Sequence, residues 1–347
     1  MKCSFKYCIF SLLALASAIY SSNSRAFAQT QAKAAAAQPA EPQEEEAKYS
    51  EEEWKALDDA TKESNYEKRS TMLLEFINKW PKSELLKNVE YEYVTILLGA
   101  CDKEEKWELL KSLSEKWRAL HPGSLSIISL IAKASEKTGD FKRCAECLEE
   151  IYAKQPSGTL AMAILETYKR ANNLAKQIEW TDKILKMPGF EGEFALAFYF
   201  VQKYTDSNNL PQAVEWCKKT LTAADAAKQP DEKSQEQLVA IRDACHRLIG
   251  RSLYESDKFE AAEKEYQRAL KYKKSSDAYY HIGMCMWQLR DVDNAMLYLA
   301  ASEIIGEDPY KVSAKENLEK LYKSKHYNNT IGIEKIYRKA KEQLLSK

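Results

Sequence analysis

Residues 248–270 read LIGRSLYESDKFEAAEKEYQRAL, and this stretch decides the fold of the chain. Three small residues in it are separated by 12 and then by 7 positions: Gly250, Ala262 and Ala269. The spacing returns 33 residues later, and again in two earlier segments, at Gly283, Ala295 and Ser302, at Ala132, Cys144 and Ile151, and at Val201, Ala213 and Thr220. Small side chains let two helices of a hairpin cross closely, so this period predicts an array of stacked helical hairpins.

Turn residues and prolines mark the boundaries of these hairpins. Polar, turn-competent residues precede an apolar one at Gly139-Asp140-Phe141, Asn172-Asn173-Leu174, Asn208-Asn209-Leu210 and Asp257-Lys258-Phe259. Prolines that end second helices follow at intervals of 41, 34 and 32 residues: Pro81, Pro122, Pro156 and Pro188. No stretch alternates apolar and polar residues for long enough to predict a strand. The sequence therefore predicts an all-α protein.

These residues resemble the tetratricopeptide repeat family. The resemblance is best over residues 248–270, where Tyr266 takes the aromatic place, and it extends to residues 279–302 and 125–158. It is looser over 50–83, 91–124, 159–190 and 194–227, because Arg69 and Leu110 stand where a small residue is usual. The resemblance implies a right-handed α-solenoid of about seven hairpins over residues 50–310, closed by capping helices over residues 311–347.

The first 49 residues differ from the rest of the chain. Lys2 and Lys6 precede a short apolar stretch and the ending Ser24-Arg25-Ala26-Phe27-Ala28, so residues 1–28 are predicted to be a cleaved signal peptide. Residues 29–49 are rich in Ala, Gln, Glu and Pro and are predicted to be a disordered linker. We therefore expect an exported bacterial protein, periplasmic or secreted, with no stable membrane insertion after cleavage.

Composition and motifs favour a binding protein over an enzyme or a nucleic-acid binder. Among the 347 residues, 52 Lys and Arg balance 52 Asp and Glu. The chain therefore lacks the excess of positive charge that is typical of a nucleic-acid-binding protein. A Gly-rich phosphate loop, a G-x-S-x-G elbow and an H-E-x-x-H motif are all missing from the sequence. We therefore predict no catalytic residue, cofactor or metal ligand.

Cys144-Ala145-Glu146-Cys147 is the motif that offers an alternative. A C-x-x-C pair can form a redox centre or contribute to a metal site. No strand is predicted before Cys144, and that residue takes the small-residue position of its second helix. Six cysteines remain after the predicted cleavage, and we interpret them as buried core residues.

The resemblance also indicates a binding surface, because the first helix of each hairpin lines a concave groove in that family. The positions that match it, predicted to bind a protein or peptide partner, are Arg247, Arg251, Tyr254, Tyr280, Met284 and Trp287. Arginine and aromatic side chains dominate interface hot spots, so these residues would suit an acidic or carboxylate-bearing peptide. Alternatively, Tyr280 and Trp287 pack on the neighbouring hairpin. The predicted function is an exported protein-interaction scaffold, with a purely structural envelope factor as the alternative.

Overall fold

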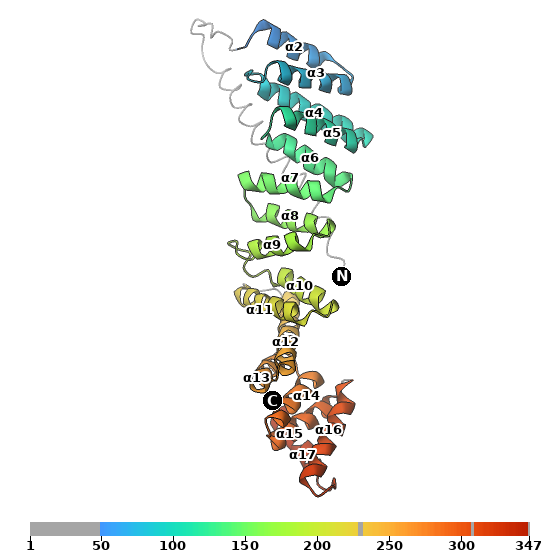
Figure 1. The fold of residues 1–347 in the computed structure, drawn as a ribbon, viewed down its shortest axis with the longest axis vertical. Helices are drawn as coiled ribbons and strands as arrows, with labels where there is room; N and C mark the ends of the chain where they lie inside the picture. Colours follow the sequence, from blue (N-terminus) through green and yellow to red (C-terminus); the bar gives the residue numbers. More distant parts are fainter. Residues whose placement is uncertain (1–48, 228–231, 307–308, 346–347) are drawn as a thin grey trace. The chain divides into compact units, whose positions relative to one another are not determined.

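A computed structural model describes residues 49–227, 232–306 and 309–345 (Figure 1). These residues form helices joined by short turns, and none of them lies in a strand. The all-α fold of helical hairpins is therefore confirmed. The predicted signal peptide and nearly all of the predicted linker lie outside the described residues. The chain divides after Ile184 into two compact units.

Unit 1 consists of eight helices in the residues that the structure describes before Ile184. They are α2 (Glu51–Lys62), α3 (Tyr66–Lys79), α4 (Leu86–Glu104), α5 (Trp107–Leu120), α6 (Leu125–Lys137), α7 (Phe141–Lys154), α8 (Gly158–Arg170) and α9 (Leu174–Ile184). Each helix packs mainly on the helices before and after it in the chain. This local packing is the property that defines a stacked helical-repeat protein.

Unit 2 continues the hairpins from residue 185 onward. Its helices are α10 (Phe194–Asp206), α11 (Leu210–Ala226), α12 (Glu232–Glu255), α13 (Phe259–Leu270), α14 (Ser276–Gln288), α15 (Val292–Ile305), α16 (Tyr310–Lys325) and α17 (Glu334–Ala340), followed by the π-helical turn η1 (Lys341–Leu345). The π-helical turn η1 contacts α14, where the hydroxyl of Tyr279 donates a hydrogen bond to the carbonyl oxygen of Leu344 at 3.0 Å.

The turns inside the hairpins share one backbone conformation. A left-handed residue ends the first helix at the sequence-predicted turns, with φ of 81° at Gly139, 51° at Asn172, 54° at Asn208 and 57° at Asp257. In three of the four, the next side chain caps the second helix, as when Asp140 accepts a hydrogen bond from the backbone N–H of Arg143 at 3.1 Å. Glycine and asparagine tolerate positive φ, which explains their use here.

The small residues lie where the two helices of a hairpin cross. Ala262, Ala269 and Ala295 are fully buried. A Cβ atom added to Gly250 would lie 3.0 Å from the ring of Tyr266, and one added to Gly283 would lie 2.9 Å from Leu299 Cγ. Such contacts leave no room for a larger side chain, so the sequence spacing identified the crossing points correctly in these two hairpins.

The crossing can be tested with two neighbouring alanines of α13. Ala262 is fully buried, whereas Ala261 is exposed. We expect Ala262→Leu to lower the free energy of unfolding by about 1–3 kcal/mol, because the crossing becomes overpacked. Ala261→Leu should change it by less than about 0.5 kcal/mol. Urea unfolding followed by circular dichroism measures both, and equal effects would show that the helix register is wrong.

Candidate functional site

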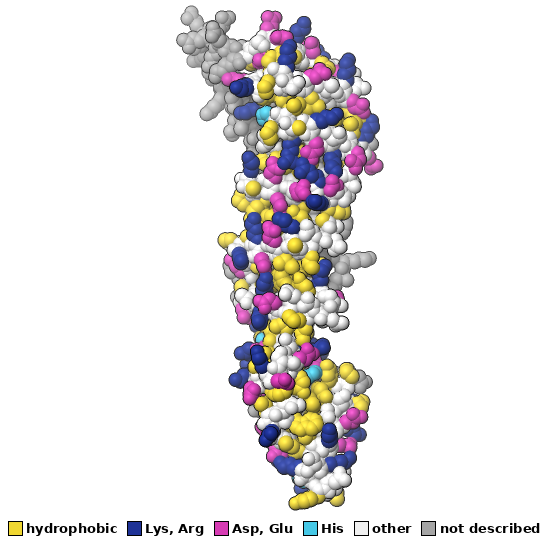
Figure 2. All heavy atoms as spheres, viewed as in Figure 1, with side chains coloured by type: hydrophobic (Ala, Val, Ile, Leu, Met, Phe, Trp, Pro, Cys, Tyr) yellow, Lys and Arg dark blue, Asp and Glu magenta, His cyan; other side chains and the backbone are white. Residues whose placement is uncertain are grey.

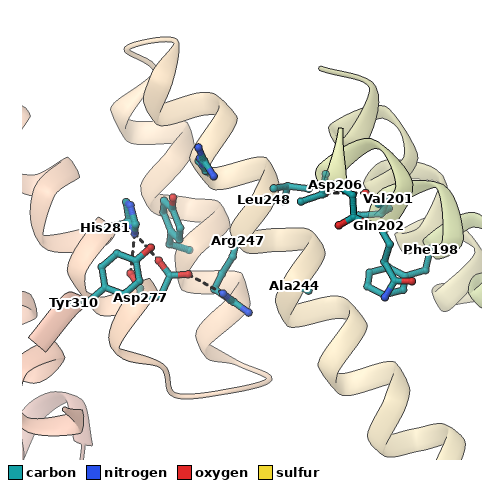
Figure 3. A pocket seen from close by; sticks show the side chains of 13 residues that line it. Phe198, Val201, Gln202, Asp206, Ala244, Arg247, Leu248, Asp277, His281 and Tyr310 are labelled. Carbon is teal, nitrogen blue, oxygen red and sulfur yellow. Dashed lines mark hydrogen bonds and ion pairs between the residues drawn. The ribbon is translucent and has the colours of Figure 1, made fainter. Parts of the chain in front are cut away.

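A cavity of about 570 Å³ lies in unit 2 (Figure 3). Its wall comes from the first helices of four successive hairpins, α10, α12, α14 and α16, with one residue from α13. The lining residues are Phe198, Val201, Gln202, Thr205, Asp206, Ala244, Arg247, Leu248, Arg251, Tyr266, Asp277, His281 and Tyr310. The cavity therefore combines an apolar wall on α10 and α12 with charged and aromatic side chains on α12, α14 and α16.

Arg247 is held in the cavity wall by two carboxylates. Its Nε lies 3.1 Å from Asp243 Oδ2 in the same helix, and its Nη1 lies 2.7 Å from Asp277 Oδ2 in α14. Burial alone would lower the pKa of Arg247, but the hydrogen bonds to both carboxylates outweigh this and raise it. The guanidinium is thus permanently charged and locally neutralised, and it ties α12 to α14.

Asp277 connects Arg247 to His281. Figure 3 shows the Asp277 carboxylate between these two side chains, and Oδ1 lies 2.8 Å from His281 Nδ1. Burial would raise the pKa of Asp277, but the hydrogen bonds from His281 and Arg247 lower it to about 2. Asp277 therefore remains ionised at any physiological pH.

Tyrosine rings surround His281. The imidazole stacks on the ring of Tyr266 with centroids 4.9 Å apart, and it meets the edges of the Tyr280 and Tyr310 rings at 5.2 and 5.3 Å. Tyr266 is almost completely buried, and its hydroxyl has no hydrogen-bond partner among the described residues. A buried hydroxyl without an acceptor costs folding free energy, so Tyr266 places an unused donor at the cavity wall.

Arg251 differs from Arg247 in its exposure. Its side chain is 62% exposed and pairs with Glu255 one turn later in α12, with Nε 2.8 Å from Oε1. An exposed ion pair of this kind contributes little free energy, so a partner can replace it at small cost. Gln202, Thr205 and Asp206 on α10 are also exposed. The cavity thus offers a ligand a cationic group on α12, and an acidic group and two neutral hydrogen-bonding groups on α10.

The structure brings only part of the sequence-predicted site to this cavity. Arg247 and Arg251 line it, while the ring of Tyr254 packs edge-on against Phe259 with centroids 5.4 Å apart. Tyr280 and Met284 both contact the side-chain amide of Asn317 in α16, at 3.2 Å from the hydroxyl and 3.7 Å from the sulfur. Trp287 lies beneath the ammonium group of Lys320 at 5.4 Å. Tyr280, Met284 and Trp287 therefore pack toward α16, the first helix of the next hairpin, which is the alternative given above for Tyr280 and Trp287.

The sequence reasoning missed Asp277, His281 and Tyr310, and the reason is geometric. Sequence periodicity aligns Tyr280 with Arg247, since the repeat is 33 residues long. The cavity instead lies beside the side of α14 that faces α12. Asp277, three residues before Tyr280, lies on that side. The signal that could have found them is charge: Asp277 is the acidic residue of α14 closest in repeat position to Arg247.

The cysteine pair of α7 does not have the environment of a redox centre. Cys144 and Cys147 are fully buried free thiols, and burial raises their pKa to about 12 and about 11. Reactive cysteines need a lowered pKa and access to solvent. The other described cysteines, Cys217, Cys245 and Cys285, are also buried with free thiols, whereas the side chain of Cys101 lies outside the described residues.

The part of the chain that the structure describes has neither a cluster of metal ligands nor a helix that could span a membrane. It holds no group of three or more His, Cys, Asp or Glu side chains placed to bind a metal ion. None of its helices is both long enough and apolar enough to span a bilayer.

In unit 2, stacked helical hairpins place their first helices side by side around one cavity, which is the arrangement of a helical-repeat scaffold. The tetratricopeptide repeat family matches residues 247–311, from α12 to the start of α16. This part of unit 2 is therefore similar to the tetratricopeptide repeat family, in agreement with the resemblance seen in the sequence.

Comparisons with whole proteins give weaker matches. No curated protein matches the chain. The crystal structure of MamA protein is 16% identical with a TM-score of 0.32, covering 63% of this chain and 90% of that one. YrrB, described as a TPR protein with an unusual peptide-binding site, is 16% identical with a TM-score of 0.36, covering 58% and 95%. A tetratricopeptide repeat protein from Parabacteroides merdae is 14% identical with a TM-score of 0.30, covering 78% and 97%.

The two arginines of the cavity should differ in their effect on stability. Arg247→Ala leaves the almost fully buried Asp243 without its cation and leaves Asp277 with His281 alone, and it should lower the free energy of unfolding by about 3 kcal/mol. Arg251→Ala removes an exposed pair and should cost less than about 0.5 kcal/mol. Urea unfolding of both variants measures the difference. If Arg247→Ala were as harmless as Arg251→Ala, the carboxylate network would not stabilise unit 2.

Proposed function

We propose that this protein is an exported interaction scaffold that binds a segment of a partner protein in the cavity of unit 2. The observation that carries the proposal is the cavity itself, to which four successive first helices contribute apolar, aromatic and charged side chains. A segment of extended or helical peptide is a ligand that spans several repeats at once. Its side chains would pack on Phe198 and Leu248.

The charges of the cavity narrow the chemistry of the partner segment. Arg247 is already satisfied by two carboxylates, so it contributes rigidity to the wall rather than a free positive charge. Arg251 is the lining cation with the weakest existing pair, and a carboxylate of the partner can displace Glu255 from it. The partner segment would therefore present an acidic group to Arg251 and apolar side chains to α10 and α12.

Export is the second part of the proposal, and residues 1–28 support it. Their basic start, short apolar stretch and small-residue ending are typical of a cleaved secretory signal. We expect the mass of the protein recovered from outside the cytoplasm to correspond to a chain that begins at Gln29. Intact-mass measurement checks this, and recovery of a chain that still contains Cys3 would contradict it.

The binding role can be tested with two matched arginines. Arg251 lines the cavity, whereas Arg268 lies on α13, is 57% exposed and pairs with Glu265 in its own helix. Arg251→Glu should weaken capture of partner proteins from an envelope extract roughly thirtyfold, as for the loss of a hot spot worth about 2 kcal/mol. Arg268→Glu serves as the control and should leave capture unchanged.

Two results would contradict this site. Equal capture by Arg251→Glu and wild type would place binding on another surface. Equal loss in both arginine variants would indicate a general electrostatic effect rather than a contact in the cavity. Melting temperatures of both variants should stay close to wild type, since both arginine side chains are more than half exposed and the largely buried Glu265 keeps its bond to His246.

A further inference from the structure

Two apolar side chains protrude from the turn between α16 and α17. Tyr327 is 99% exposed and Ile331 is 85% exposed, more than the other large apolar side chains that the structure describes as exposed. Single exposed apolar residues are ordinary on protein surfaces. Two large apolar side chains that are almost fully exposed within the same turn are unusual, because folding removes neither of them from water.

The turn holds these side chains outward through defined backbone contacts. Tyr327 and Asn328 both have positive φ, 51° and 63°, a conformation that is unfavourable for a bulky residue such as tyrosine. The N–H of Asn328 donates to the carbonyl of Lys323 at 2.9 Å, and the hydroxyl of Tyr322 donates to the carbonyl of Ile331 at 2.8 Å. Backbone strain that the surrounding contacts maintain is a recurring feature of functional sites.

Lysines flank the protruding turn. A shallow cavity of about 700 Å³ beside it is lined by Lys320, Lys323, Ser324, Lys325, Tyr327 and Asn328. Lys323 pairs with Glu319 at 3.4 Å and Lys325 with Asp293 at 2.5 Å, but both pairs are exposed and therefore weak. We call Lys320, Lys323, Lys325, Tyr327 and Ile331 the lysine–tyrosine tip.

The charge of this region differs from that of the whole chain. Residues 310–345 contain nine Lys and Arg against four Asp and Glu, although the 347-residue chain has a formal net charge of zero. On the face of unit 2 that Figure 2 shows, Lys and Arg side chains lie near the end of the unit where α16 turns into α17. A positive excess confined to one end favours a partner with a negatively charged surface.

We propose that the lysine–tyrosine tip docks on the surface of an anionic phospholipid bilayer. A convex tip with an exposed tyrosine and isoleucine can enter the headgroup layer, where aromatic side chains are favoured. Nearby lysines are attracted by the negative surface potential of acidic lipids. The shallow cavity beside the turn is lined by three lysines and by no acidic residue, which suits the continuous negative surface of such a bilayer. This contact needs no membrane-spanning helix, and it is independent of the cavity assigned to partner binding.

The test is co-flotation of the full-length chain with vesicles. One set contains phosphatidylcholine alone, and the other contains about 30% phosphatidylglycerol as the acidic lipid. The variants are Tyr327→Ser with Ile331→Ser, and Lys320→Glu with Lys323→Glu. Val312→Ser is the matched control, because Val312 is an apolar residue of α16 that is 57% exposed but lies at the opposite end of the helix. All chains share the same N-terminal residues, so binding through residues 1–48 contributes equally.

We expect the wild type to bind acidic vesicles about tenfold more strongly than neutral ones, and each tip variant to lose about tenfold on acidic vesicles. Val312→Ser should bind like the wild type, and every variant should keep the wild-type melting temperature. Two results would overturn the proposal: binding by the tip variants that equals the wild type, or no preference of the wild type for acidic vesicles. The second result would indicate that the lysine–tyrosine tip binds an acidic protein partner instead of a bilayer.

Discussion

The structure depends on how closely two helices of a hairpin can approach each other. At Gly250 and Gly283 the opposing side chain lies only 3.0 and 2.9 Å from where a Cβ atom would be, so the first helix rests directly on Tyr266 or Leu299 of the second. The close crossing fixes the rotation of each helix about its axis. It thereby determines which residues of α12 and α14 face the core and which remain for the cavity wall. The chemistry of the cavity wall thus depends on glycines that let a large side chain of the second helix pack against the first.

The sequence predicted the fold well because its decisive signals are local. Gly139, Asn172, Asn208 and Asp257 take the left-handed turn conformation, which glycine adopts because it lacks a Cβ atom and which Asn and Asp tolerate, and each follows the end of a helix. Two further turns of this kind were not predicted, because Glu105 and Arg290 adopt φ of 54° and 66° there, and nothing in a glutamate or arginine side chain predicts that conformation. The division after Ile184 was also missed, since it reflects contacts between segments rather than any change in composition.

The candidate site was predicted only in part, for a physical reason. Helical periodicity identifies which face of a helix is not in its own hairpin core, and the family resemblance implied that Arg247 and Arg251 lie on the groove-lining face. It does not show how the next first helix is rotated against that face. Tyr280 therefore turned out to contact Asn317, and Asp277 took its place beside Arg247, at 2.7 Å. Contacts between hairpins depend on interhelical angles that no spacing within one repeat encodes.

The packing of each helix mainly on its chain neighbours has a consequence for how the array can change over time. Because few contacts join distant segments within a unit, a hairpin can be duplicated or lost without dismantling the remaining core, provided that the flanking small residues are kept. Arg69 and Leu110 show that individual repeats tolerate large side chains at positions usually small: Arg69 pairs with Glu92, and Leu110 is fully buried. The repeats of this chain are therefore free to diverge one by one, each acquiring its own surface while the neighbouring hairpins preserve the scaffold.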